Sequence, residues 1–393
     1  MNKFLEDMLK RLARIQKRYC LLIFITTLFI TGFFGFGLTQ VYLQTDIDKE
    51  LPQDLPVFKL SNKITNKFGG QDTVLVVIQL DKSGNVKGAP TDIRDPRIIQ
   101  TLVDLEDLLR DEVLIDNVQS VGSFFKQTGV PPSIDDVKLV LSNIPQAKLF
   151  FNKDYSATLL YTSADLGTSE KKTKTITNVI REDISSVSKP PGIKMSLTGA
   201  PPMRLIILEL LTYDSVYTLL LTAIIILFLL MIMERSINQG LLAFMPLVMS
   251  VVWTLGSMGW LNIPLSIATV GVGAMILGLG VEYNVFLLSR YKEERNKNKT
   301  QAESLLVAVP GVGLAILGSG ITTIIGFMAL TLSSLPMLQH LGFTLALGIF
   351  YCLFVAVFLS PPMIMLEENF RERWTVRTYK KYSKRMRMNR SLE

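Results

Sequence analysis

The side chain best placed to do chemistry is Glu282, an acidic residue inside a long apolar run. Setting tyrosines aside, no other carboxylate or base lies within the apolar runs that are long enough to span a membrane. An acidic group near the middle of a membrane costs on the order of 3 kcal/mol, and such groups usually mark an ion or proton path. We therefore expect Glu282 to relay protons, with Ser319, Thr322 and Thr323 of another run as hydrogen-bond partners.

Other interpretations of Glu282 stay open. It could hydrogen-bond neighbouring helices and lock them together, or it could have a regulatory or ligand-binding role. Small residues near it permit close helix approach, for which tight packing is the ordinary explanation and a sliding interface the alternative. These small residues are Gly271, Gly273, Ala274, Gly278, Gly280, Gly318 and Gly320.

No conventional catalytic or metal site is visible. The sequence has one histidine, His340, and two cysteines, both in apolar runs, so neither a nucleophile–base set nor a zinc site is expected. We find no glycine-rich phosphate loop, and we expect no enzyme and no cofactor. His340 falls at the outer membrane edge, where we interpret it as a solvated loop or interfacial residue, with a proton sensor as the alternative.

Six apolar runs are long enough to cross a bilayer, whose core needs about 20 helical residues. The first run is longer than the roughly 7–15 residues of a signal-peptide core, and no small-residue cleavage site follows it. Hydrophobic residues make up 49% of the chain and charged residues only 19%. We predict spans at about 19–39, 215–233, 241–260, 267–288, 312–332 and 343–365.

Lys and Arg residues set the expected orientation. They gather before the first run, between the fourth and fifth runs, and after the sixth. We therefore attribute the formal net charge of +7 to Lys and Arg residues that set the membrane orientation, and we expect no nucleic-acid partner. Both termini are predicted to be cytoplasmic in a plasma-membrane protein. The predicted parts are a basic N-terminus (1–18), a first span (19–39), an extracytoplasmic domain (40–213), a five-helix block (214–366) and a basic tail (367–393).

The extracytoplasmic domain alternates between strand and helix patterns. The β-branched run 73–80 predicts a buried strand, and further strands are expected within 113–124, at 157–163 and at 193–197. Helical spacing predicts helices from Pro56, after Asp95-Pro96, over 132–143 and around 170–187. The resulting order is that of a ferredoxin-like βαββαβ core with one inserted helix. The expected fold is thus a six-helix membrane bundle with an α+β domain.

Four short motifs on this topology resemble the RND superfamily of transporters, within it the MMPL and hydrophobe-exporter branch. They are Thr45-Asp46 through Leu51-Pro52 to Phe68-Gly69-Gly70, LTGAP at 197–201, GLGVEYNVFLLSRY at 278–291 and SGITTIIGF at 319–327. The resemblance covers nearly the whole chain, as a single unit of one span, a porter domain and five spans. In that family the position of Glu282 is typically Asp followed by Tyr and is assigned to proton relay, so the resemblance adds Tyr283 to the relay.

The resemblance implies secondary export of a hydrophobic or amphiphilic, lipid-like compound, driven by the proton motive force. A single unit has half the membrane bundle of full-length members, which implies a homodimer with two Glu282 side chains near a two-fold axis. Membrane lipids are expected partners, and a docking partner in an outer membrane is not. Two alternatives remain: a lipid- or sterol-sensing module that does not transport, and an accessory factor for protein export like SecD and SecF.

Overall fold

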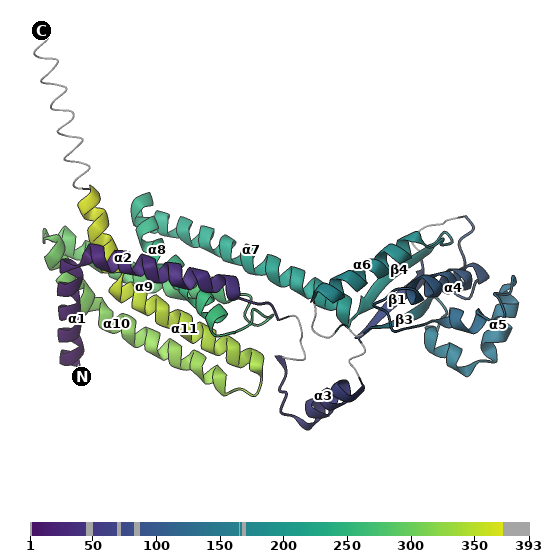
Figure 1. Ribbon diagram of the computed structural model, residues 1–393. Helices are drawn as coiled ribbons and strands as arrows, with labels where there is room; N and C mark the ends of the chain where they lie inside the picture. Colours follow the sequence, from purple (N-terminus) through teal and green to yellow (C-terminus); the bar gives the residue numbers. More distant parts are fainter. Residues whose placement is uncertain are drawn as a thin grey trace, which may run out of the picture. The chain divides into compact units, whose positions relative to one another are not determined.

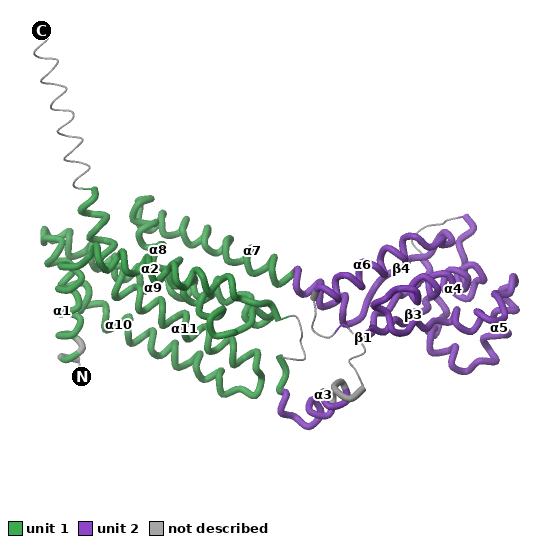
Figure 2. Tube along the Cα trace, viewed as in Figure 1, with its two compact units in different colours: residues 1–52, 210–393 green, residues 53–209 purple. Residues whose placement is uncertain are grey.

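The computed structural model describes residues 2–44, 50–68, 72–81, 87–164, 166 and 170–371. The chain divides into two compact units, one of Met1–Pro52 with Leu210–Glu393 and the other of Gln53–Glu209 (Figure 2). The unit boundaries thus fall inside the expected domain 40–213. Thr45-Asp46, Gly69-Gly70 and the basic tail beyond Arg371 lie outside the described residues.

Six helices of the described chain are long and apolar enough to cross a membrane, as predicted. Five of them, and α7 from Leu210 onward, lie side by side in the first unit (Figure 1). The six are α2 (Cys20–Gly37, extended by the 3-10 turn η1, Leu38–Gln40), α7 (Ala200–Glu234), α8 (Ile237–Trp260), α9 (Val272–Asn296), α10 (Gln301–Ala329, followed by η5, Leu330–Leu332) and α11 (Pro336–Phe358).

Several helices extend beyond the apolar runs that predict them. α7 begins at Ala200, well before the apolar run, because prolines are tolerated in a first helical turn and polar residues then continue the helix. α11 begins at Pro336 for the same reason. After Leu359 the chain continues as a further helical stretch, residues 360–371, so the last predicted span is two helical pieces.

The closest approach in the bundle is between α2 and α8. A Cβ added to Gly259 would lie 2.0 Å from the backbone oxygen of Gly37, and one added to Gly256 would lie 2.1 Å from that of Phe34. The two backbones therefore touch, which is the use of small residues that membrane helices favour. Trp253 of α8 adds a hydrogen bond of 2.9 Å from its indole nitrogen to Thr31 Oγ1.

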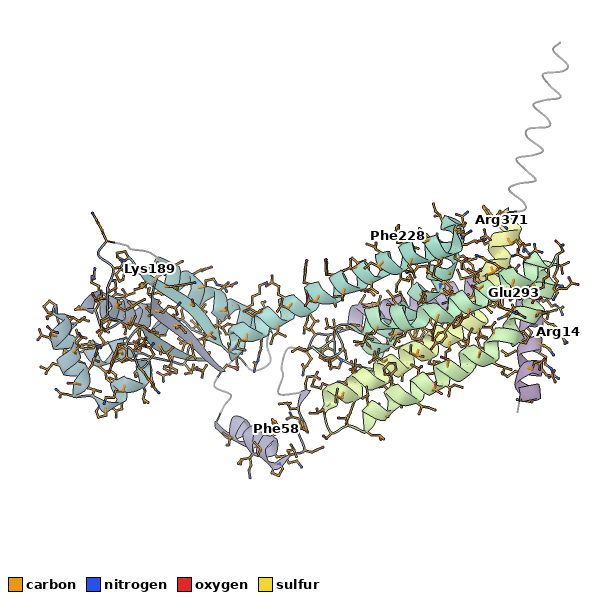
Figure 3. The ribbon with its side chains drawn as sticks, turned by 180° about the vertical axis from the view of Figure 1, so that it is seen from behind. Arg14, Phe58, Lys189, Phe228, Glu293 and Arg371 are labelled. Atoms are coloured by element: carbon orange, nitrogen blue, oxygen red, sulfur yellow. The ribbon has the colours of Figure 1, made fainter. Side chains whose placement is uncertain are left out.

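A short amphipathic helix, α1 (Asn2–Arg18), runs across one end of the bundle (Figure 1). Leu9 and Ala13 are buried, and Gln16 Nε2 donates to the carbonyl oxygen of Val357 at 2.7 Å. We call this end, formed by 234–240, 289–300 and 366–371, the tail end. Figure 3 shows Arg14, Glu293 and Arg371 gathered there. We call the other end, formed by 38–44, 261–266 and 330–340, the linker end.

The second unit holds a four-stranded antiparallel sheet in the order β2-β3-β1-β4. The strands lie where the sequence predicts them. They are β1 (Asp72–Leu80), β2 (Asn117–Gln119), β3 (Ala157–Ala164) and β4 (Ile193–Gly199). The helices of this unit are α3 (Pro56–Phe68), α4 (Pro96–Arg110), α5 (Ile134–Ser142) and α6 (Glu170–Ser186), with 3-10 turns η3 (Val121–Phe125) and η4 (Pro145–Phe150).

One core joins the sheet to α4 and α6. Val74, Val76 and Ile78 alternate along β1 and are fully buried, against the buried faces of the two helices. The Asp95 side chain caps α4 by accepting from the backbone of Arg97 at 2.9 Å, as its position before Pro96 predicts. β2 is only three residues long, because Ser120 caps the 3-10 turn η3 directly after it.

A buried carboxylate holds this turn to α4. Glu106 is fully buried and accepts from the backbone nitrogen of Ser120 at 2.7 Å and from the hydroxyl of Ser123. Lys126 Nζ lies 3.1 Å from its second oxygen. The neighbouring Asp107 also pairs with Lys126, at 2.5 Å, but its side chain is 64% exposed.

Glu106→Ala should destabilise this unit by about 3 kcal/mol, because it leaves buried donors and a cation without their acceptor. Asp107→Ala is the matched control and should cost under about 1 kcal/mol, as exposed pairs do. Hydrogen exchange of the backbone amides at 117–126 measures both. Equal effects of the two changes would contradict the assigned role of Glu106.

Candidate functional site

Glu282 lies inside the membrane-spanning part of α9 but on its exposed side. It is ten residues after Val272, which places it about 15 Å along the helix. Met275, Leu279 and Phe286 are exposed on the same stripe of the helix. In a single chain the carboxyl group therefore points away from the bundle, among apolar side chains that suit lipid or another protein.

Tyr283 points the other way, into the bundle. It is 1% exposed, and its phenol lies within reach of Thr323, Ser319 and Cys352. Successive side chains of an α-helix are rotated by about 100° about its axis, so adjacent residues lie on different faces. The structure thus brings Ser319 and Thr323 to Tyr283, whereas in the described chain no hydrogen bond joins them to Glu282.

Two of the three predicted hydroxyl partners donate hydrogen bonds within their own helix. Thr322 Oγ1 donates to the carbonyl oxygen of Ser319 at 2.7 Å, and Thr323 Oγ1 donates to the same oxygen at 3.0 Å. Each hydroxyl retains its lone pairs, so each remains available as an acceptor. Ser319 and Thr322 are exposed on α10 and Thr323 is half-buried.

The small residues of α9 and α10 divide into two groups. One group packs within the chain: a Cβ at Gly273 would lie 3.0 Å from Leu219, one at Gly280 would lie 2.4 Å from Cys352 Sγ, and one at Gly320 would lie 2.3 Å from Leu353. The other group, Gly278 and Gly318, is exposed and has no atom within 4 Å of such a Cβ. Gly271 caps the start of α9, and Ala274 is half-buried.

We define the open face as the exposed small and polar residues of these two neighbouring helices. Its members are Gly278, Glu282, Gly318, Ser319 and Thr322. The two helices are neighbours, and between them these residues offer a carboxyl group, hydroxyl groups and room for close approach in the span region. Such a face suits contact with a second helical surface better than contact with lipid, since hydrocarbon supplies no hydrogen bonds.

The tail end holds a separate network of charges. Glu368 accepts from the hydroxyl of Tyr291 and, at 2.9 Å, from Nε of Arg295. Burial acts to raise the pKa of the Glu368 carboxyl, but these hydrogen bonds outweigh it and hold the pKa below its ordinary value. Glu368 is thus an ionised anchor between α9 and the helical stretch 360–371.

The described residues contain no group of three or more His, Cys, Asp or Glu side chains that could hold a metal ion. His340 lies near the start of α11 and is half-buried, which differs from the expected loop. Its Nδ1 atom is buried, with no hydrogen-bond partner in the part of the chain that the structure describes. Two residues that the sequence analysis did not single out, Glu50 and Ser266, lie beside it at the linker end.

The bundle, the open face and the α/β unit together define a multi-span membrane protein with a folded domain between its first and second spans. A family model described as "MMPL family" matches residues 50–390, and the chain belongs to this family. The resemblance to the RND superfamily is thereby confirmed.

Three relatives show how far the likeness extends. A membrane protein of Methanocaldococcus jannaschii is 37% identical over 372 residues, which cover 93% of this chain and 95% of the relative. The siderophore exporter MmpL5 of Mycobacterium tuberculosis is 23% identical over 206 residues, 49% of this chain and 20% of the exporter. The solved structure of the hedgehog release protein Disp from the water bear Hypsibius dujardini aligns with a TM-score of 0.60 at 13% identity, over 91% of this chain and 50% of that chain.

The two groups of glycines allow a matched test of packing. Gly280→Ala should destabilise the bundle by about 1–3 kcal/mol, because the added methyl group would overlap a fully buried side chain. Gly278→Ala should leave the stability of a monomeric, detergent-solubilised chain unchanged. Thermal unfolding in detergent measures both, and a smaller loss for Gly280→Ala than for Gly278→Ala would overturn the assignment.

Proposed function

We propose that this protein is an RND-type secondary transporter that exports hydrophobic or amphiphilic compounds, driven by protons that bind Glu282, and that it acts as a homodimer. The observation that carries the proposal is the open face: a membrane-embedded carboxyl group is exposed on α9, and open glycines and exposed hydroxyl groups occur on α9 and the neighbouring α10. Family membership and the named exporter among the relatives support transport as the activity.

We propose that a second copy of the chain packs against the open face. Leaving Glu282 against lipid costs on the order of 3 kcal/mol, which covering it would relieve. Gly278 and Gly318 permit a second backbone to come close. In a two-fold contact the same patch meets itself, so the two Glu282 side chains would lie near the axis. The chain aligns with half of the Disp chain, which agrees with two copies forming one transporter.

Proton binding would couple to movement at this interface. A protonated Glu282 is neutral and fits an apolar contact, whereas an ionised one needs water or a donor. Tyr283, the next residue on the buried side of α9, would connect that change to α10 through Thr323 and Ser319. A proton that enters down 100 mV supplies about 2.3 kcal/mol, enough to bias a two-state cycle.

The charge distribution gives the proposed orientation. Lys and Arg residues of α1 and of the segment between α9 and α10 lie at the tail end, which we assign to the cytoplasm. The linker end and the α/β unit are then outside. The strand order β2-β3-β1-β4, with α4 and α6 as the crossovers, supports a ferredoxin-like core for that porter domain.

Replacing Glu282 should separate transport from folding. In proteoliposomes loaded with fluorescent amphiphiles, the unmodified protein should move cargo only under an imposed pH gradient. Glu282→Gln should reduce this movement to the level of empty liposomes, because the amide cannot bind and release protons. Glu293→Gln, which removes an exposed carboxylate at the tail end, is the control and should retain transport. Wild-type rates in Glu282→Gln would exclude the relay.

The dimer has its own test by cysteine cross-linking. Gly278→Cys in a Cys20→Ser background should cross-link between copies in the membrane, since the open face would lie at the interface. Cys352 can stay, because it is fully buried. The control is Gly35→Cys on α2, another position with open space around it. Cross-linking that is as strong from position 35, or absent from position 278, would contradict the proposed interface.

A further inference from the structure

Three polar side chains from distant parts of the chain, those of Glu50, Ser266 and His340, interact at the linker end of the bundle. Glu50 precedes the second unit, Ser266 lies between α8 and α9, and His340 lies near the start of α11. Glu50 is only 8% exposed and Ser266 only 1%. Among the described residues, Glu50 Oε2, Ser266 Oγ and His340 Nδ1 are buried atoms with no partner within ordinary hydrogen-bond distance, although Ser266 and His340 lie near enough to act on the Glu50 carboxyl group. Such orphan atoms are rare in folded proteins and call for an explanation.

The surroundings hold these side chains in place. Residues 42–44, at the end of the first span, are tied to the same loop as Ser266: the backbone nitrogen of Gln44 donates to the carbonyl oxygen of Leu265 at 2.9 Å, and that of Leu265 donates to the carbonyl oxygen of Tyr42 at 2.9 Å. Thr269 Oγ1 accepts from the backbone nitrogen of Ser266 at 2.8 Å, which fixes the loop. The loop that carries Ser266 is therefore held by tertiary contacts of the bundle.

The surroundings of Glu50 favour the protonated form of its carboxyl group. Burial raises the pKa of the Glu50 carboxyl, while His340 and Ser266 act in the opposite direction. Burial and the Glu50 charge also raise the pKa of Tyr42. Among the described residues, Tyr42 and His340 are the titratable groups that interact with Glu50. With neither Glu50 nor His340 protonated, the buried carboxylate would lack a neighbouring cation among the described residues.

We propose that Glu50, Ser266 and His340 form a proton-binding site at the linker end of the bundle. One proton from the adjoining water is held by the carboxyl–imidazole pair, and the Ser266 hydroxyl donates to the carboxyl group. The bound proton fastens the segment that leads into the second unit to α11 and to the loop between α8 and α9. This site is separate from Glu282, and it faces the outside if the proposed orientation is correct.

The contacts of α11 connect the two sites mechanically. His340, Thr344, Gly348 and Cys352 recur every four residues along this helix, and Thr344 and Cys352 are fully buried. Cys352 packs against Gly280, two residues before Glu282. A change in how α11 is held at the linker end therefore reaches the segment of α9 that carries Glu282. Tight packing transmits such shifts because a dense interior deforms little.

The test uses the fact that the chain has a single histidine. The full-length protein with isotope-labelled histidine, in lipid nanodiscs, gives one imidazole signal whose pH dependence reports on His340 alone. Glu50→Gln should weaken proton binding by the imidazole about tenfold, because it removes the neighbouring negative charge. The control Asp54→Asn, at an exposed carboxylate nearby in sequence, should leave the titration unchanged.

The reciprocal variant keeps the proposal testable if Glu50→Gln does not fold. In His340→Gln the Glu50 carboxyl should stay protonated to higher pH, which its infrared carbonyl band would show. Glu282→Gln should leave the histidine titration unchanged, so failure of the relay and failure of this site are distinguishable. An unchanged histidine titration in Glu50→Gln, or an equal shift in Asp54→Asn, would overturn the proposal.

Discussion

The hydrocarbon core of a bilayer offers no hydrogen bonds, so each polar group in a span must find its partner inside the protein. Most polar side chains of this bundle satisfy the constraint locally. The hydroxyls of Thr27, Ser250 and Thr254 donate to carbonyl oxygens one turn earlier in their own helices, at 2.8, 3.0 and 2.7 Å. Asn284 instead accepts from Ser360 at 2.5 Å. Against this background Glu282 is conspicuous, and both the proposed dimer and the proposed proton coupling follow from its exposure.

The same constraint made much of the fold predictable. Apolar runs must form helices in lipid, and β-branched alternation produced the strands of the second unit, so both could be located from residue types. Helix ends were harder to place, because polar residues continue a helix wherever no breaker stops them, as in the first part of α7. The short length of β2 could not be predicted either, since the cap at Ser120 and the contact with Glu106 determine where the strand ends.

Sequence reasoning identified the residues of the candidate site more readily than the helix faces on which their side chains lie. Glu282 was evident as a charge in an apolar run, but a pattern with little amphipathicity does not tell which side of α9 it occupies. The structure separates it from Tyr283 and divides the glycines between packed and open positions. Glu50 and Ser266 could not be predicted, because only tertiary packing brings them to His340. The glycines of α8 that touch α2, Gly256 and Gly259, had a visible small-x-x-small spacing that we did not use.

The helix α1 has a consequence for the membrane around the protein. It docks across the tail end through Leu9 and Gln16, while Phe4 and Ile15 on its other side are exposed beside basic residues. Because α2 begins just after Arg18, we expect α1 to lie at the depth of the headgroups of one leaflet. A helix at that depth adds to the area that the protein takes up in one leaflet only. Such an asymmetric wedge stores lateral stress in flat bilayers and releases it where the membrane curves.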